Sequence, residues 1–266
     1  MRVCVVTGSP FGGAAAALSE IAAAQGVELA CVILSDNSAV RRSRTKMFRK
    51  IARIGLLGAL NGVRMRQWYR HHNGRDLRAE CERLGIPLVT VPTVNGAECI
   101  ETLKEYRIDL GISLGNGYIA SRVFSVPPEG FINYHGELLP AYPGAQSIIW
   151  PIYDEQTQTG FTLHCIDRGI DTGAILEQRR FDIVFRENLR ETIAATAAVV
   201  HPELPRTLRL LLEEWPTRRA AAVPQGPPTR HFTTPTFWQF LRMARNNRKF
   251  YRLHGGAQNA PPPRSS

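Results

Sequence analysis

Short apolar runs rich in β-branched residues alternate with longer stretches of helical spacing along the first half of the chain. The helical stretches include residues 13–26 and 93–106, and the apolar runs are residues 3–6, 28–34, 87–91 and 109–114. Strands that alternate with helices are typical of a parallel sheet with both faces covered. The pattern therefore predicts an α/β fold built on a doubly wound, mostly parallel sheet.

The second half of the chain continues this pattern and then changes. Residues 160–166 and 174–178 alternate like strands, and residues 189–212 have the spacing of a long helix that prolines must interrupt. Pro, Ala and Gly are frequent in the range after residue 214, which suggests a linker. We therefore predict a main domain, a linker and a basic helix with a disordered end, over residues 1–214, 215–235 and 236–266.

Positive charge is concentrated in two segments. The 266-residue chain has a net charge of +10, but residues 41–70 hold ten Lys or Arg and no acid, and the part after Glu214 holds nine and again no acid. Residues 41–70 form a basic helical insertion, and residues 236–253 form a second amphipathic basic helix. Each is either a surface helix packed by its apolar side or an element that contacts a polyanion, such as anionic lipid, a nucleotide-linked substrate or RNA.

The composition of the whole chain is that of an ordinary globular protein, with 44% apolar and 21% charged residues. No apolar run approaches the roughly 18 residues needed to cross a bilayer. The five cysteines show no CxxC spacing, which indicates buried free thiols rather than a zinc site or a disulfide framework. These features favour a cytoplasmic protein, with the basic helices as a means of peripheral attachment to the inner face of a membrane.

Asn133 and His135 are the first candidates for chemistry. They lie two residues apart in a short apolar run, so on a strand both side chains point to one face, and Asp171 follows on a later loop. An amide, an imidazole and a carboxylate supply a stabiliser for an oxyanion, a group that moves protons near neutral pH, and an orienting charge. Separately, a glycine-rich turn at residues 8–13 opens a helix, where backbone N–H groups either hold an anion or only form the turn.

The sequence around these residues resembles the folate-dependent formyltransferases, which use 10-formyltetrahydrofolate. Residues 133–144, Asn-Tyr-His-Gly-Glu-Leu-Leu-Pro-Ala-Tyr-Pro-Gly, are similar to the Asn-x-His-x-x-Leu-Leu-Pro signature of that family. Residues 160–173 are similar to its second conserved block. The resemblance covers residues 1 to about 212, and it implies that the catalytic residues are Asn133, His135 and Asp171 and that no metal is needed.

The resemblance also implies a folate pocket between the loop after the fourth strand and the loop that carries Asp171. Glycines in these loops let the backbone reach the edge of a flat pterin ring, and apolar side chains supply walls. His164, on the neighbouring predicted strand, is interpreted as a core or supporting histidine. The implied folate contacts are Leu114, Asn116, Gly117, Tyr118, Ile119, Ile166, Asp167 and Gly169.

The signature does not specify the formyl acceptor. The tail after Glu214 is short and helical, unlike the barrel-like domain of tRNA formyltransferases, and glycinamide ribonucleotide formyltransferases lack the basic segments. By elimination, the resemblance favours a small, anionic amine acceptor, namely an amino sugar linked to a nucleotide or lipid. The alternatives are glycinamide ribonucleotide, aminoacyl-tRNA, hydrolysis of the formyl donor, and a non-enzymatic role in RNA or membrane binding. The oligomeric state is not predicted.

Overall fold

A seven-stranded sheet forms the centre of the computed structural model, which describes residues 1–38, 44–68, 74–144, 147–226 and 230–258. Within these residues the strands lie in the order β3-β2-β1-β4-β5-β6-β7. The first five strands in this order pair in parallel, whereas β6 pairs antiparallel with both β5 and β7. The prediction of a mostly parallel, doubly wound sheet is confirmed. The strands are β1 Arg2–Thr7, β2 Glu28–Ser35, β3 Leu88–Val91, β4 Leu110–Ser113, β5 Phe131–His135, β6 Gln158–Cys165 and β7 Ile175–Asp182.

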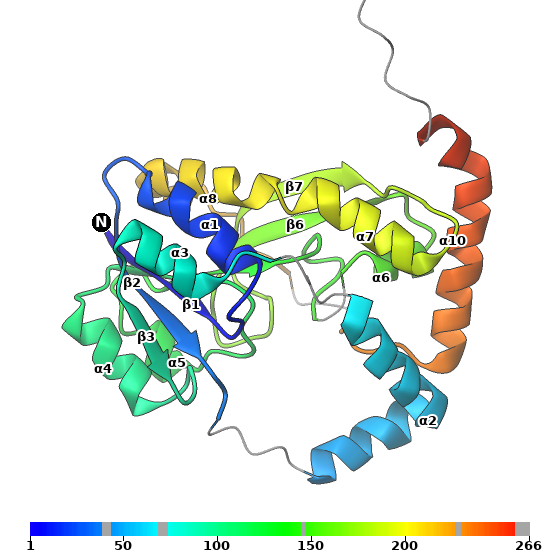
Figure 1. The fold of residues 1–266 in the computed structure, drawn as a ribbon, viewed down its shortest axis with the longest axis horizontal. Helices are drawn as coiled ribbons and strands as arrows, with labels where there is room; N and C mark the ends of the chain where they lie inside the picture. Colours follow the sequence, from blue (N-terminus) through cyan, green and yellow to red (C-terminus); the bar gives the residue numbers. More distant parts are fainter. Residues whose placement is uncertain (39–43, 69–73, 145–146, 227–229, 259–266) are drawn as a thin grey trace, which may run out of the picture.

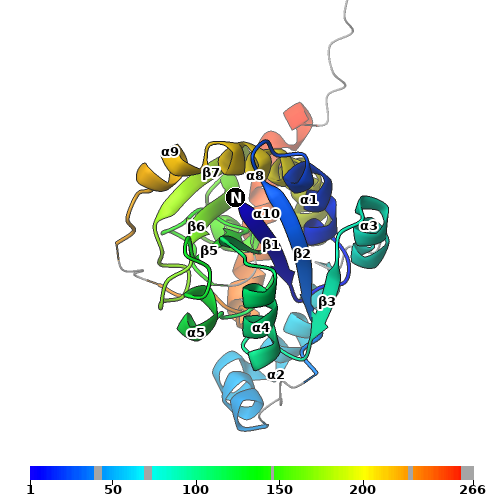
Figure 2. The same ribbon diagram turned by 90° about the vertical axis from the view of Figure 1, so that its left-hand side faces the viewer.

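Helices cover both faces of the sheet (Figure 1, Figure 2). In the central strand β1, Val3 and Val5 pack toward one helical layer, whereas Cys4 and Val6 pack toward the other, because successive side chains of a strand point to opposite faces. The first layer contains α1 Gly13–Ala22, α3 Leu77–Leu84 and α8 Glu203–Glu213, and the second contains α4 Ala97–Glu105 and α5 Ser121–Phe124.

Helix boundaries follow local side-chain chemistry. Helix α3, which the apolar pattern does not predict, begins after Asp76, whose carboxylate accepts a first-turn backbone N–H at 2.9 Å, and it ends at Gly85 in the left-handed conformation (φ 66°). The long helix predicted over residues 189–212 is divided into α7 Leu189–Val200 and α8. Pro202 lies at the junction, where it has no N–H to continue α7.

The basic insertion and the tail helix lie together at the end of the sheet opposite the N-terminus (Figure 1). Helix α2 Arg44–Trp68 breaks at Gly55 (φ 75°), and α10 Phe237–Gln258 packs on α2, on α7 and on α6 Ile149–Tyr153. Their inward faces form one apolar cluster, which includes Met65, Ile149, Ile152, Phe185, Met243 and Phe250. Each basic helix is therefore attached to the protein by an apolar face. Among the helices that the structure describes, none has the length and apolarity to cross a bilayer.

Much of the range 215–235, which the sequence predicts as a linker, is packed on the main domain. It begins with helix α9 Trp215–Ala220, whose Trp215 is 5% exposed. Further along, Val223 pairs with Ile175 at the edge of β7, and Phe232 is buried beside Gly144. Buried aromatic side chains and backbone pairing hold these stretches on the main domain in spite of a composition rich in Pro and Ala, and the division into main domain, linker and basic helix stays a prediction. The boundary at residue 214 stays a prediction, and the end from residue 259 on lies outside the described residues.

Candidate active site

Asn133 and His135 occupy the carboxyl end of β5, where both side chains point to the same face of the sheet. Antiparallel pairing with β6 sets Asn133 opposite His164 and His135 opposite Thr162. This pairing is fixed by the apolar residues that flank the polar ones, because a shift of one residue would turn Ile132 from the core. The strand therefore presents an amide and an imidazole at the carboxyl edge of the sheet.

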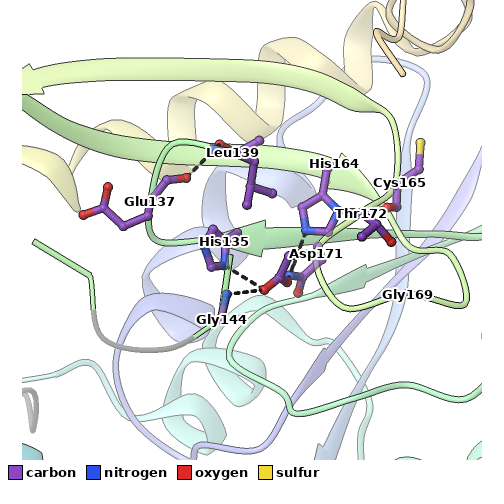
Figure 3. A network of polar contacts seen from close by, with 12 residues as sticks. His135, Glu137, Leu139, Gly144, His164, Cys165, Gly169, Asp171 and Thr172 are labelled. Atoms are coloured by element: carbon purple, nitrogen blue, oxygen red, sulfur yellow. Dashed lines mark hydrogen bonds and ion pairs between the residues drawn. The ribbon is translucent and has the colours of Figure 1, made fainter. Parts of the chain in front are cut away.

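Asp171 reaches His135 and His164 from the loop between β6 and β7 (Figure 3). Its Oδ2 lies 3.6 Å from His135 Nδ1, and its Oδ1 lies 3.8 Å from His164 Nε2. The backbone N–H of Gly144 donates a hydrogen bond to Oδ2 at 2.8 Å. Asp171 itself has φ 56°, a conformation that non-glycine residues rarely adopt, and such strain is concentrated at functional sites. The structure thus brings the three predicted catalytic side chains together.

His164 belongs to the same cluster, although the sequence suggests only a supporting role. Asn133 Nδ2 lies 3.2 Å from His164 Nε2, and His164 Nδ1 lies 2.8 Å from the carbonyl oxygen of Cys165. Since a carbonyl only accepts, Nδ1 carries the hydrogen and Nε2 accepts from the Asn133 amide. Burial lowers the pKa of His164, which favours this neutral form. The register of β5 against β6, which periodicity alone does not give, is the signal that would have revealed this contact.

His135 is oriented by a backbone carbonyl. Its Nε2 lies 2.7 Å from the oxygen of Tyr142, so Nε2 carries a hydrogen and donates it there. Its other nitrogen, Nδ1, therefore faces Asp171 and is the atom at which a proton can be taken up or released. The imidazole is 8% exposed, so a charge formed on it would be felt strongly by the nearby carboxylate.

A cavity of about 550 Å³ opens beside this cluster, a size typical of small-molecule sites. Asn133, His135 and Asp171 line it. All but one of the predicted folate contacts line it, namely Asn116, Gly117, Tyr118, Ile119, Ile166, Asp167 and Gly169. The sequence gives no sign of two further lining residues, Phe232 and Thr233, because they come from the range predicted as a linker.

Two of these lining residues shape the loops. Asp167 Oδ1 accepts hydrogen bonds from Gly169 N at 2.9 Å and from Thr172 Oγ1 at 2.6 Å, which closes the loop that carries Asp171. Asn116 Nδ2 donates to the Val6 carbonyl at 2.6 Å and lies 3.2 Å from Ser113 Oγ. The amide nitrogen of Asn116 is therefore committed to holding the loop, and glycine backbone on either side of it is left to meet a ligand.

A second cavity of about 630 Å³ adjoins the first, and the two share Gly115 and Tyr134. Leu114, predicted as a folate contact, lines this second cavity instead. Its wall includes Gly12 and Gly13 at the N-terminus of α1, together with Arg75 and Ser9. The partial positive charge of the α1 N-terminus suits this cavity to an anion, and Arg75, whose guanidinium also lies 3.7 Å from Glu80 Oε1, adds a cation to its wall.

Glu137 is buried behind the site and is 3% exposed. Its Oε1 accepts from Thr159 Oγ1 at 2.6 Å and from Ile148 N at 2.5 Å, and its Oε2 accepts from Leu138 N at 3.2 Å. Burial raises the pKa of Glu137 to about 7 in spite of these donors. The carboxyl group therefore links the end of β5 to β6 and to the segment that leads into α6. The sequence offers no role for it.

The structure also bears on metals and thiols. The five cysteines are unpaired, and all but Cys165 are buried, which confirms the prediction of free thiols. Within the described ranges, no three His, Cys, Asp or Glu side chains are arranged to hold a metal ion.

Comparison with known protein families gives a match to a model described as "Formyl transferase" over residues 1–208. A methionyl-tRNA formyltransferase from Kosmotoga olearia is 38% identical over 105 residues, which is 39% of this chain and 34% of that protein. Another, from Geotalea daltonii, is 34% identical over 131 residues, 49% of this chain and 42% of that protein. The chain therefore covers less than half of the length of these relatives.

Solved structures share the fold. Phosphoribosylglycinamide formyltransferase from Bacillus halodurans aligns with a TM-score of 0.55 at 22% identity, covering 81% of this chain and 97% of that one. An N-formyltransferase from Helicobacter canadensis, in complex with folinic acid and dTDP-3-aminofucose, aligns with a TM-score of 0.55 at 18% identity. The alignment covers 87% of this chain and 70% of that one. Identities this low support a common fold and leave the substrate open.

Proposed function

Because the chain belongs to the formyl transferase family, we propose that it transfers a formyl group from 10-formyltetrahydrofolate to a primary amine. The observation that carries this proposal is the convergence of Asn133, His135 and Asp171 in the wall of one cavity. The cavity suits the donor, since glycine backbone at Gly117 and Gly169 leaves room for the edge of a flat ring, and Tyr118 adds an apolar wall. When bound, the donor supplies a formyl group that is already activated for attack by an amine.

The side chains then divide the chemistry. An amide nitrogen carries two hydrogens, so Asn133 can hold His164 with one and donate the other to the formyl oxygen as negative charge develops there. The amine must lose a proton as its nitrogen bonds to the formyl carbon, and the nitrogen of the departing donor must gain one. His135 Nδ1 is the exchangeable position, and Asp171 at 3.6 Å stabilises the imidazolium that carries the proton.

For the acceptor, we propose an amino sugar attached to a nucleotide or lipid carrier. The second cavity supports this choice, because it adjoins the catalytic residues through Gly115 and Tyr134 and presents a helix N-terminus and Arg75 to an anion. A neighbour of the same fold was solved with a dTDP-linked amino sugar. Aminoacyl-tRNA is the second candidate, favoured by sequence similarity to methionyl-tRNA formyltransferases. Peripheral attachment to a membrane also stays a proposal, carried by α2 and α10.

The test supplies 10-formyltetrahydrofolate with one amine at a time: a dTDP-amino sugar, glycinamide ribonucleotide or aminoacyl-tRNA. We expect tetrahydrofolate to form in equal amount to a formylated amino sugar. The His135→Ala variant should form neither, whereas a variant of the exposed His231, His231→Ala, should match the unmodified protein. Formate release without any amine would identify a hydrolase instead, and product formed only on aminoacyl-tRNA would replace the sugar with tRNA.

A further inference from the structure

Exposed apolar side chains are concentrated on the two basic helices. Of the thirteen large apolar residues that are exposed among the described residues, eight lie on α2 or α10. The side chains of Leu56, Leu60 and Trp238 are 69%, 60% and 76% exposed. Surface apolar residues scattered singly are ordinary, whereas a gathered set indicates a surface that is covered by something else. The eight residues are Phe48, Leu56, Leu57, Leu60, Val63, Trp238, Leu241 and Leu253.

Packing of α2 on the protein does not account for these residues. The inward face of α2 is made by Ile54, Gly58 and Met65, and a Cβ at Gly58 would lie 3.4 Å from backbone atoms of the segment that leads into α10. Leu56, Leu60 and Val63 follow the spacing of the opposite face. Gly58 on the inward face lies against Phe237, so α2 contacts the start of α10, and the next residue of α10, Trp238, is exposed.

The same two helices carry most of the positive charge. The sequence of α2 contains seven Lys or Arg and that of α10 contains five, and neither contains an acid. Lys249 is paired with Glu155 at 2.7 Å, and Arg242 stacks on Tyr153. Other basic residues of these helices, such as Arg49 on α2 and Arg245 on α10, are exposed. The exposed apolar face is therefore bordered by cations.

We propose that α2 and α10 form a docking surface for an anionic lipid bilayer. Leucine and tryptophan side chains insert at the level of the headgroups, and arginines beside them contact lipid phosphates and the negative surface potential. An RNA backbone would leave Leu56, Leu57 and Leu60 without an apolar partner. A second copy of this chain, related by a two-fold axis, would bring cationic faces together, which is unfavourable.

Docking would place the catalytic cavity next to the membrane. Arg53 Nη2 on α2 donates to Thr233 Oγ1 at 3.0 Å, and Thr233 and Phe232 line the cavity beside Asp171. A short segment thus connects the proposed lipid-binding face to the wall of the catalytic site. An acceptor held at the bilayer surface would reach the site without leaving that surface. The docking surface does not depend on which amine is formylated.

The experiment is cosedimentation of the full chain with vesicles of phosphatidylcholine, with and without phosphatidylserine. We expect binding only with phosphatidylserine, weakened at least about tenfold by raising the salt to about 0.5 M. The double variant Leu56→Ser/Leu60→Ser should lower binding at least about tenfold, because two inserted side chains are lost. Its control is Val199→Ser, which removes an exposed apolar side chain from α7, outside the proposed docking surface. Likewise, Arg49→Gln should weaken binding, and Arg78→Gln on α3 should not.

Four results would overturn the proposal. One is equal binding to both kinds of vesicle, and another is no binding to either. A third is a dimer by light scattering that the leucine variant abolishes, which would assign the face to a second copy of the chain. The last is RNA binding that the leucine variant leaves intact while vesicles fail to compete. Formyl transfer measured in detergent-free buffer, without vesicles, is a separate readout, and its loss or retention says nothing about docking.

Discussion

Folding removes the carboxyl group of Glu137 from water, so the stability of the protein should depend on pH through this residue. In the folded protein its pKa is raised from 4.5 to about 7 by burial, although three hydrogen-bond donors oppose the shift. The folded state therefore binds this proton more tightly than the unfolded state does. The stabilising contribution is fully present below the unfolded pKa of 4.5 and is lost as the pH rises through about 7.

The size of the effect follows from the two pKa values. At about 1.4 kcal/mol for each pKa unit, the rise corresponds to about 3 kcal/mol. Linkage between protonation and folding predicts that the free energy of unfolding falls by about 2.5 kcal/mol from about pH 5 to about pH 8 on account of Glu137 alone. That is a large fraction of the total stability of a typical domain.

Urea unfolding of the unmodified protein and of Glu137→Gln, measured across this pH range, isolates the contribution. Glutamine keeps the shape of the side chain and can accept from Thr159 and Ile148, but it does not ionise. From about pH 5 to about pH 8, we expect the free energy of unfolding of this variant to fall by about 2.5 kcal/mol less than that of the unmodified protein. Exposed Glu101→Gln controls for the loss of one carboxylate. Equal slopes for Glu137→Gln and the unmodified protein would refute the reasoning and show that the three donors keep Glu137 ionised throughout.

Two further substitutions test the site and the loop beside it. Asp171→Asn keeps an oxygen for Gly144 N but removes the charge facing His135, so kcat should fall by about 10³-fold with the urea midpoint unchanged, and Asp182→Asn should have no effect on kcat. Near-normal turnover would remove Asp171 from the mechanism. Gly144→Ala places a Cβ against the Phe232 carbonyl at φ 108° and should cost at least about 2 kcal/mol of stability by urea unfolding. Gly13→Ala is its control, because a Cβ there meets nothing within 4 Å. Equal stability of the two variants would show that the loop at residue 144 accommodates the added Cβ without a cost in free energy.

Sequence periodicity predicted the parts of this protein that depend on which face a residue occupies. The apolar runs predicted β1 to β4 to within a few residues, since a strand buried on both faces has to be apolar along its length, and alternating positions predicted β6 and the first half of β7. The same periodicity placed Asn133 and His135 on one face of β5. The break of the long helix near Pro202 was also predictable, because proline removes a hydrogen bond wherever it stands.

The distances between segments far apart in the chain were decided by the tertiary structure. The contact of Asn133 with His164 depends on the register of two antiparallel strands, and the approach of Asp171 depends on a loop closed by Asp167. Composition indicated a linker after residue 214, yet Phe232 is buried and lines the catalytic cavity, because tertiary packing decides the path of that segment. Local sequence fixes the direction in which each side chain points, whereas the packing of helices and strands fixes which side chains meet, and catalysis requires both.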